Sequence, residues 1–334
     1  MKGITIKDIG RELGIAASTV SRALTNNPDI SDSTRQLVLN YAREHNYKPN
    51  VMASNLRRAR NTTLGLVIPS AMNFFFARVL KGVEQVAAEK GYNIVISQTD
   101  DNPEREVEAL RALMALRVAG ILGCVNHSPE ALEMLNEVLL DEIPLVLFDR
   151  LLPIECDQVV SDDFGGAFKA VEYLIHSGAR RVAYYSSTLN EHTGAERFRG
   201  YKEALKKHEI PFDKKLVLDC SSREDALIMT PDFLRSVGSL DAVLATNDQT
   251  AAGILESAKM LGYQVPEQLQ ICGFSNDMIT RHTDPMLSTV QQHGKEIGQK
   301  AINLLLARIQ QSDEPLPLVT EIVPTDLIIR ESTH

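Results

Sequence analysis

The sequence predicts a small all-α domain followed by two α/β lobes, each built on a doubly wound parallel sheet. Two short helix patterns joined by a glycine turn occupy the first 24 residues. Beyond residue 62, short β-rich runs alternate with amphipathic stretches, which is typical of βαβ units whose sheets are covered on both faces. With 334 residues, 44% of them hydrophobic, the chain is long enough for two or three domains.

The first helix is predicted to begin behind Thr5. Thr5 and Asp8 make a capping-box pattern, which satisfies free backbone amides at a helix start. Apolar residues recur at helical spacing, and Gly14 ends the helix. The apolar positions are Ile6, Ile9 and Leu13.

A second helix is predicted over residues 17–24 and a third over residues 32–45, behind Ser31. In the second helix, Val20 and Leu24 are expected to face inward. The third helix is expected to bury four side chains, so that the three helices share one small core. These side chains are Leu37, Val38, Tyr41 and Ala42.

The outward face of the second helix is predicted to carry Ala17, Ser18, Ser21 and Arg22. In a helix-turn-helix, the N-terminal part of the second helix enters the major groove of DNA, so these side chains would meet base edges. On spacing alone the alternative stays open that the pair is an ordinary αα-hairpin.

Charge favours the DNA-binding interpretation. Residues 1–60 carry ten Lys and Arg against five Asp and Glu, a net charge of +5, whereas the whole chain has −9. The remaining 274 residues therefore carry −14. A basic head on an acidic body is expected when only one end of a protein contacts phosphates.

Other composition features bound the class of protein. No signal peptide precedes the first helix, and no apolar run approaches the roughly 20 residues of a membrane span, so we expect a cytoplasmic, nucleoid-associated protein without a membrane partner. The cysteines form no C-x-x-C pair, so we expect reduced, mostly buried thiols, no metal and no cofactor. They are Cys124, Cys156, Cys220 and Cys272.

The α/β region is predicted to divide near residues 158–163, where the succession of units breaks. The segments 287–292 and 321–330, with a helix over 295–310 between them, are expected to return the chain through both lobes. A cleft between two such lobes suits a small ligand, because open α/β sheets bind beyond the carboxyl ends of their strands. The β-rich runs are 64–68, 94–97, 120–125, 145–148, 159–161, 182–185, 216–218, 242–245 and 269–274.

Five motifs occur in order along the chain. They are T-I-K-D-I-G-R-E-L-G-I-A-A-S-T-V-S-R-A-L from Thr5, Y-K-P-N from Tyr47, A-S-N-L from Ala53, T-N-D-Q from Thr246 and C-G-F from Cys272. Together they resemble the LacI/GalR family of bacterial transcription regulators.

The resemblance implies a helix-turn-helix DNA-binding domain over 1–48 and a hinge helix with linker over 49–61. It implies an effector-binding and dimerisation domain of periplasmic-binding-protein type over 62–334. Its first lobe would be about 62–160 plus 293–322, and its second about 161–290 plus 323–334.

For DNA contact, the resemblance places Ala17, Ser18 and Arg22 on base-reading positions. Arg22 is the strongest candidate for bidentate contact with a guanine, the alternative being a phosphate contact. Ala16 stands where the family often has a capping Ser, which weakens this helix start slightly. The remaining expected contacts in this domain are Thr5, Thr19 and Ser21.

In the hinge, Leu56 would be the apolar wedge that opens a base step from the minor groove, with Ala53 beside it. Arg57 would lie near the DNA backbone, and Asn50 belongs to the same set. The alternative is that residues 49–62 are a solvated linker.

For the effector, Asp149 and Arg197 occupy positions similar to family ligand contacts, and Asn247 and Asp248 complete that set. The alternative for Asp149 and Asp248 is helix capping or a salt link between lobes. Many sugar-binding members carry an acid soon after the Gly-aromatic pair, where this chain has Ser275, so a bidentate grip on paired hydroxyls is in doubt there.

The first lobe would contribute Asn126 and one or more of Asn73, Phe74 and Phe75, whose rings offer a stacking face. Ordinary core packing is the alternative for the phenylalanines.

The resulting hypothesis is a repressor that binds a near-palindromic operator as a homodimer and is controlled by a small-molecule effector, a sugar or related metabolite. The alternatives are a corepressor-dependent or activating regulator and a ligand-independent DNA-binding protein. An enzyme is not expected, because the chain lacks H-E-x-x-H, G-x-S-x-G, P-loop and G-x-G-x-x-G motifs. A solute-binding transport protein would need an export signal and no DNA-reading domain.

Overall fold

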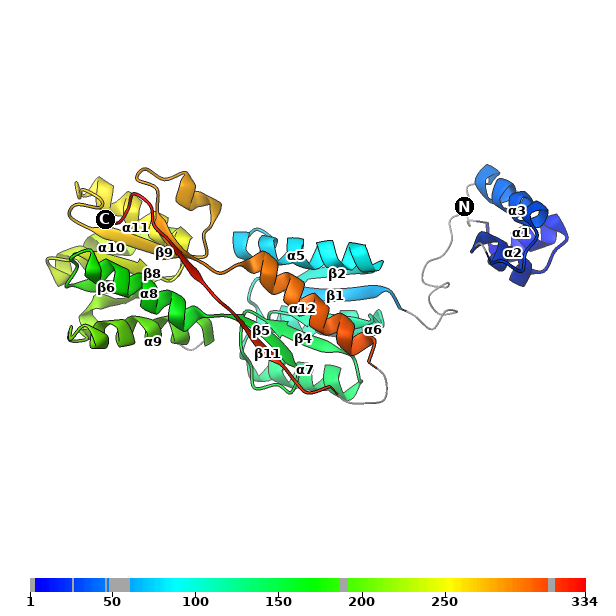
Figure 1. The fold of residues 1–334 in the computed structure, drawn as a ribbon, viewed down its shortest axis with the longest axis horizontal. Coiled ribbons are helices and arrows are strands. Elements are labelled where there is room, and N and C mark those ends of the chain that lie inside the picture. The colour runs from blue at the N-terminus through cyan, green and yellow to red at the C-terminus, as the bar shows by residue number, and fades with distance from the viewer. Residues whose placement is uncertain (1–3, 26, 46, 48–60, 187–191, 312–315) are drawn as a thin grey trace. The chain divides into compact units, whose positions relative to one another are not determined.

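A computed structural model describes residues 4–25, 27–45, 47, 61–186, 192–311 and 316–334. The chain divides into two compact units, residues 1–61 and residues 62–334. The described part of the first unit is all-α, and the second unit holds two largely parallel sheets with helices on both faces, as Figure 1 shows. The predicted fold class is therefore confirmed, while the predicted domain boundaries stay a prediction.

In its described residues the first unit contains α1 (Ile6–Leu13), α2 (Ala17–Leu24) and α3 (Asp32–Glu44). One prediction for its core was wrong, because Leu37 is 50% exposed. Val38 and Ala42 lie one turn apart on the buried face of α3, and Leu37 points about 100° away from Val38 because of the helical repeat. The fully or nearly buried apolar side chains are Ile9, Val20, Ala23, Val38 and Ala42.

The second unit contains two six-stranded sheets. The first sheet has, in spatial order, β11 (Thr320–Val323), β5 (Asp157–Ser161), β4 (Leu145–Phe148), β3 (Gly120–Gly123), β1 (Thr63–Ile68) and β2 (Asn93–Gln98). The second has β12 (Asp326–Ile328), β10 (Ser288–Gln291), β9 (Gln270–Phe274), β8 (Ala242–Ala245), β6 (Val182–Ser186) and β7 (Val217–Asp219).

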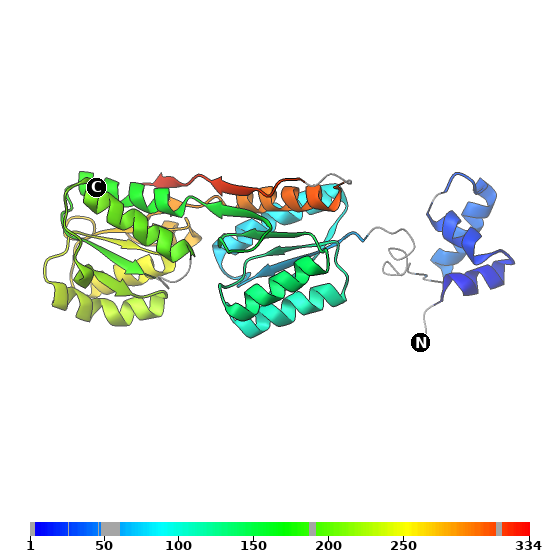
Figure 2. The same ribbon diagram turned by 90° about the horizontal axis from the view of Figure 1, so that it is seen from below.

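Each sheet lies between two helical layers, which Figure 2 shows from the side. On the first sheet, α5 (Phe74–Lys90) and α12 (Gly294–Ile309) share one apolar core, and α6 (Pro103–Ala115) and α7 (Pro129–Leu140) share the other. On the second sheet, α8 (Asp163–His176) and α9 (His192–Lys207) cover one face. The helices α10 (Arg223–Val237) and α11 (Asp248–Met260) cover the opposite face. Burial on both faces explains why most of the strands read as continuous apolar runs.

The chain crosses between the two sheets three times, after β5, after β10 and after β11 (Figure 1). The crossing segments bond to one another: the Asp162 N–H donates to the Val323 carbonyl at 2.8 Å, and Gln292 Nε2 donates to Ser161 Oγ at 3.2 Å. The three crossing segments are therefore linked to one another.

The segment 321–330, which was expected to return the chain through both lobes, forms two strands. β11 ends at Val323, Pro324 follows without a backbone N–H, and β12 then joins the second sheet. β12 pairs with β10 in the antiparallel sense, so the second sheet is mixed at this edge.

All four cysteines are free and buried, as predicted. Burial raises the pKa of Cys220 to about 11 and that of Cys156 to about 12, which keeps both thiols protonated and unreactive at neutral pH. Among the helices that the structure describes, none is long and apolar enough to cross a membrane.

Candidate nucleic-acid interface and ligand pocket

The turn between α1 and α2 depends on two glycines. Gly14 has a φ of 67°, which is the left-handed cap that only glycine adopts without strain. Gly10 is buried where the helices meet, and a Cβ there would lie 2.7 Å from the Ile15 carbonyl oxygen. The close approach of α1 and α2 therefore requires glycine at position 10.

The helix starts are as predicted. Thr5 caps α1, with the Asp8 N–H donating to Thr5 Oγ1 at 3.3 Å and the Thr5 N–H donating to Asp8 Oδ2 at 3.0 Å. These hydrogen bonds from Thr5 lower the pKa of Asp8. Ala16 is the N-cap of α2 and makes no side-chain capping bond. Thr5 therefore has a structural role at the helix start whether or not it also contacts DNA.

The outer face of α2 carries the predicted base-reading residues. Ser18 and Arg22 are exposed, while Ala17, Thr19 and Ser21 are half-buried. Within the described part of the chain, Arg22 forms no ion pair, so its guanidinium group is available to an external acceptor. The predicted hinge contacts Asn50, Ala53, Leu56 and Arg57 lie outside the described residues.

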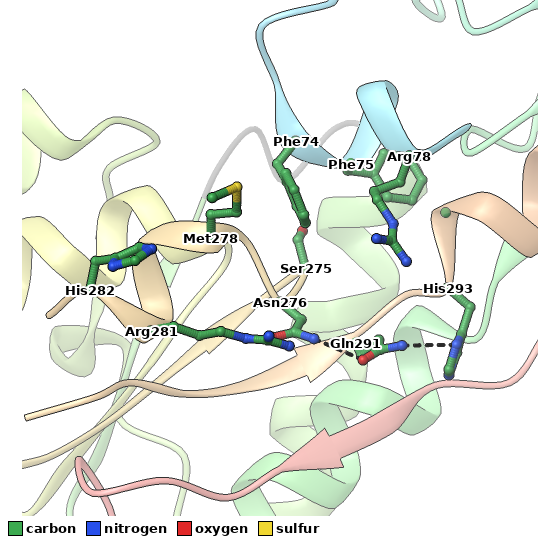
Figure 3. Close-up of a pocket in the computed structure, with 11 residues that line it drawn as sticks. Phe74, Phe75, Arg78, Ser275, Asn276, Met278, Arg281, His282, Gln291 and His293 are labelled. Carbon is green, nitrogen blue, oxygen red and sulfur yellow. Dashed lines mark hydrogen bonds between the residues drawn. The ribbon is translucent and has the colours of Figure 1, made fainter. Parts of the chain in front are cut away.

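One pocket, which we call the larger pocket, has a volume of about 620 Å³ and is lined from both lobes (Figure 3). α5 contributes the predicted residues Phe74 and Phe75, and the second lobe contributes Ser275 after β9. Phe75 is only 6% exposed and belongs to the core, so core packing accounts for it, whereas Phe74 is half-buried. The other lining residues are Arg78, Asn276, Met278, Arg281, His282, Gln291, His293 and Gly294.

A chain of hydrogen bonds fixes the side chains along this pocket. Arg330 donates to Asn276 Oδ1 at 2.7 Å, Asn276 Nδ2 donates to Gln291 Oε1 at 2.8 Å, and Gln291 Nε2 lies 3.0 Å from His293 Nδ1. Because arginine can only donate, the chain has one direction, in which His293 accepts at Nδ1 and donates from Nε2 to Asp326. Figure 3 shows the Asn276, Gln291 and His293 part of this chain.

A smaller pocket of about 390 Å³ brings together the predicted residues Asn73, Asn247, Asp248 and Ser275. Two of them are committed to helix starts: Asn73 Oδ1 accepts from the Phe75 N–H at 2.9 Å, and Asn247 Oδ1 accepts from the Thr250 N–H at 2.8 Å. Capping explains these asparagines without a ligand.

Asp248 is also engaged within the protein. Its Oδ1 accepts from the Thr289 hydroxyl at 2.6 Å and its Oδ2 from the Asp277 N–H at 2.7 Å. The carboxyl group packs against Gly273, where a Cβ would come within 2.2 Å of Oδ1. Burial raises the pKa of Asp248 to about 7 in spite of the two hydrogen bonds.

Asp149 and Arg197 share a buried electrostatic neighbourhood but line neither pocket. Burial raises the pKa of Asp149 to about 6, and its backbone has a φ of 69° at the end of β4. Arg197 donates to Asp163 at 2.7 Å and to the Thr246 carbonyl at 2.6 Å, and its guanidinium lies 3.9 Å from the Phe274 ring centre. Arg197 thus holds α8, α9 and the end of β8 together.

Asn126 lies apart from both pockets. Its Nδ2 donates to the Asp101 carbonyl at 2.7 Å and its Oδ1 accepts from Arg150. Eight of the nine predicted effector residues are therefore divided between two pockets and the buried neighbourhood of Asp149 and Arg197, Asn126 lies outside these groups, and the role of all nine in binding stays a prediction.

Several residues of the larger pocket were not predicted from the sequence. Arg78 lies four residues after Phe74 on the same helix, so helical spacing could have linked the two. Gln291 and His293 come at the carboxyl end of β10, where ligand-binding residues of parallel sheets are expected. Arg281 carries no comparable signal, because it reaches the pocket from the 3-10 turn η2 (Met278–Arg281).

One group in the described residues could supply metal ligands. Donor atoms of Glu172, His176 and His208 lie within 4.8 Å of one another. Lys207 Nζ already donates to Glu172 at 2.6 Å, and hydrogen bonds from Lys207 and His208 lower the pKa of Glu172. The carboxylate is thus engaged by protein partners, and we assign it no metal.

Comparison with known proteins matches both units. Residues 5–50 match the family of bacterial regulatory proteins called lacI, and residues 171–333 match the periplasmic binding protein-like domain. The catabolite control protein A of Priestia megaterium is 30% identical over 99% of each chain. The ribose operon repressor of Bacillus subtilis is 31% identical over 99% of this chain and 98% of the relative.

Solved structures agree with this match. A transcriptional regulator CelR in complex with cellobiose has a TM-score of 0.74 and 26% identity, over 98% of this chain and 99% of that one. A lac repressor dimer bound to operator, with 22% identity, shares the fold with a TM-score of 0.86 over 99% of each chain. The chain therefore belongs to the LacI family of bacterial transcription regulators, whose DNA binding is controlled by an effector.

Proposed function

We propose that the chain represses transcription by binding a near-palindromic operator as a homodimer through α2, and that a small molecule in the larger pocket controls this binding. The observation that carries the proposal is the pairing of two features in one chain. Arg22 stands exposed without an ion pair among the described residues, and a pocket of about 620 Å³ is lined from both lobes of the other unit. Such a protein would work at chromosomal DNA in the cytoplasm.

The pocket suits an effector because its lining comes from elements that can move relative to one another. Phe74 belongs to the first lobe and Ser275 to the second, and three linked segments join the lobes. A ligand that contacts both sides binds one lobe arrangement better than the other and shifts the population toward it. The operator must then change the affinity for the ligand by the same factor as the ligand changes the affinity for the operator.

The names of the relatives support a sugar or related metabolite as the effector. Two of the curated relatives are ribose operon repressors, and one similar structure contains cellobiose. The pocket offers hydroxyl and amide groups for such a ligand, together with the Phe74 ring. Whether the ligand releases the operator or tightens its binding decides between an inducer and a corepressor.

Gel-shift assays on the DNA upstream of the gene test the DNA-binding half of the proposal. Arg22→Gln is expected to weaken binding to the specific fragment by about 1–3 kcal/mol, because a base contact is lost, and to change binding to random DNA much less. Arg43→Gln removes one exposed positive charge from α3 and is the matched control. Equal losses of specific and random binding in Arg22→Gln would contradict base reading by Arg22.

The same assay tests the alternative of a ligand-independent DNA-binding protein. Release or tightening of the operator complex by a sugar supports effector control. The alternative predicts specific binding that no metabolite of the cell changes.

A further inference from the structure

We propose that the ligand of the larger pocket is an anion, an organic phosphate or carboxylate, held by Arg78 and Arg281. This inference rests on the proposed function, because it names the chemical class of ligand for the same pocket. It comes from the charges of the lining and from the position of the two arginines on different lobes.

Among the described residues that line the pocket, two are arginines and none carries a carboxylate. Its ionisable residues are Arg78, Arg281, His282 and His293. Within the described residues, neither arginine forms an ion pair, and Arg78 has only the Phe74 ring, whose centre is 5.8 Å from its guanidinium carbon. This local charge opposes the composition, since the chain beyond residue 60 carries −14.

A third cation adds to the positive potential. Arg330 lies behind Asn276, and its pKa is lowered by burial and by the neighbouring charge of Arg281. Two carboxylates, those of Asp326 and Asp248, are connected to Asn276 through hydrogen bonds, and each already has a partner within the protein. Asp326 binds His293 at 2.8 Å, and Asp248 binds Thr289 at 2.6 Å. A concave site of one charge sign concentrates counter-ions of the other sign.

The two arginines approach the pocket from different lobes. Figure 3 shows the guanidinium groups of Arg78, on α5, and Arg281, at the end of η2, both extending toward the space around Asn276. A phosphate or carboxylate accepts paired hydrogen bonds from a guanidinium group, so one anion could be contacted from both lobes. The Phe74 ring beside Arg78 offers a face for the carbon skeleton of the ligand.

Such a ligand explains how the pocket could control the lobes. Without an anion, two cations from different lobes line one pocket and repel each other, and with an anion both are attracted to a shared partner. Ser275 and Asn276 are neutral, so no acid at these positions competes with the ligand for the arginines. A neutral sugar would leave both charges without a partner.

Binding of inorganic phosphate tests the inference without knowledge of the natural ligand. Phosphate is titrated into the full-length chain at constant ionic strength, with chloride as the replaced ion, and the dissociation constant is measured by calorimetry. The variants are Arg78→Gln, Arg281→Gln and the double variant. The control is Arg235→Gln, which changes an exposed arginine of α10 that lines neither pocket.

Each single substitution is expected to weaken phosphate binding about tenfold, because a hydrogen bond to a charged group is lost, and the control is expected to leave it unchanged. The double variant is expected to lose binding. Phosphate that binds the double variant as well as the wild type, or that binds neither, would overturn the proposal.

A matched set of galactose, galacturonate and galactose 6-phosphate distinguishes the two sources of the anion. Tighter binding of galacturonate favours a carboxylate ligand, and tighter binding of the phosphate ester favours a phosphorylated one. Tighter binding of galactose, unchanged by the double substitution, overturns the anion and leaves the proposed function intact. Arginine-dependent phosphate binding in a protein whose operator affinity no ligand alters would instead overturn the proposed function alone.

Discussion

Replacing Asp248 by Asn tests whether this buried carboxyl group is structural. In the folded chain its pKa is about 7, against 3.8 for an unperturbed carboxyl group, because burial disfavours the charged form. The folded state therefore keeps its proton to higher pH than the unfolded state. Because of this difference, the free energy of unfolding falls as the pH rises from about 4 to about 7 and then stays level.

The magnitude follows from the same two values. At pH 8 the raised pKa costs about 4 kcal/mol, and at pH 5 it costs less than half of that, since each unit of pKa difference corresponds to about 1.4 kcal/mol. An Asn side chain can keep both contacts, donating to the Thr289 hydroxyl and accepting from the Asp277 N–H. Asp248→Asn therefore imitates the protonated carboxyl group and avoids the cost of its charge.

We expect the stability of Asp248→Asn relative to the wild type to rise by about 3 kcal/mol between pH 5 and pH 8. Urea unfolding of the full-length chain, followed by circular dichroism at several pH values, measures this difference. Asp149 is present in both proteins, so its contribution to the pH dependence cancels in the difference between them. Asp232→Asn, which changes an exposed residue of α10, is the control. A pH-independent difference, or a variant less stable than the wild type at pH 8, would refute the reasoning.

Two further predictions concern packing. Gly10→Ala is expected to abolish operator binding while leaving the unfolding of the larger unit unchanged. The reason is that the added Cβ would lie 2.7 Å from the Ile15 carbonyl oxygen and push α2 away. Wild-type operator affinity in this variant would contradict the close approach of α1 and α2. Arg308→Met is expected to destabilise the larger unit by about 3–5 kcal/mol in urea unfolding, because it leaves a buried carboxylate without its ion-pair partner. Arg308 donates two hydrogen bonds of 2.7 Å to Asp157, whose side chain is 1% exposed. Arg308→Lys keeps the charge and should lose less, so equal losses in the two variants would argue against the ion pair.

Local patterns predicted the elements of the fold. The helix over 17–24 and the strand over 145–148 have the predicted bounds, because helical and strand periodicity are local properties of the sequence. Leu37 was misplaced because it precedes Val38 on the same turn, and apolarity alone does not say which of two neighbours faces the core. The passage of segment 321–330 through both lobes was predicted, but its partner strands β5 and β10 were not, because they are distant in the sequence and the segment itself does not encode them.

The candidate site was predicted less completely. Phe74 and Ser275 were found through the family resemblance and line the larger pocket. Arg78 and Arg281 were not found, because a charged residue on a helix or a short turn has no pattern that distinguishes a pocket from solvent. Asn247 was predicted as a ligand contact, which stays a prediction, and in the structure its side chain caps a helix start by accepting from the Thr250 N–H.

The central claim is that a ligand in the pocket and operator DNA at α2 act on one equilibrium. The most direct measurement titrates the tightest-binding member of the galactose set into the full-length chain, with and without a saturating operator fragment. The account predicts two different ligand affinities, whose ratio equals the change that the ligand causes in operator affinity. Identical ligand affinities with and without operator, for a ligand that binds the pocket, would contradict the account.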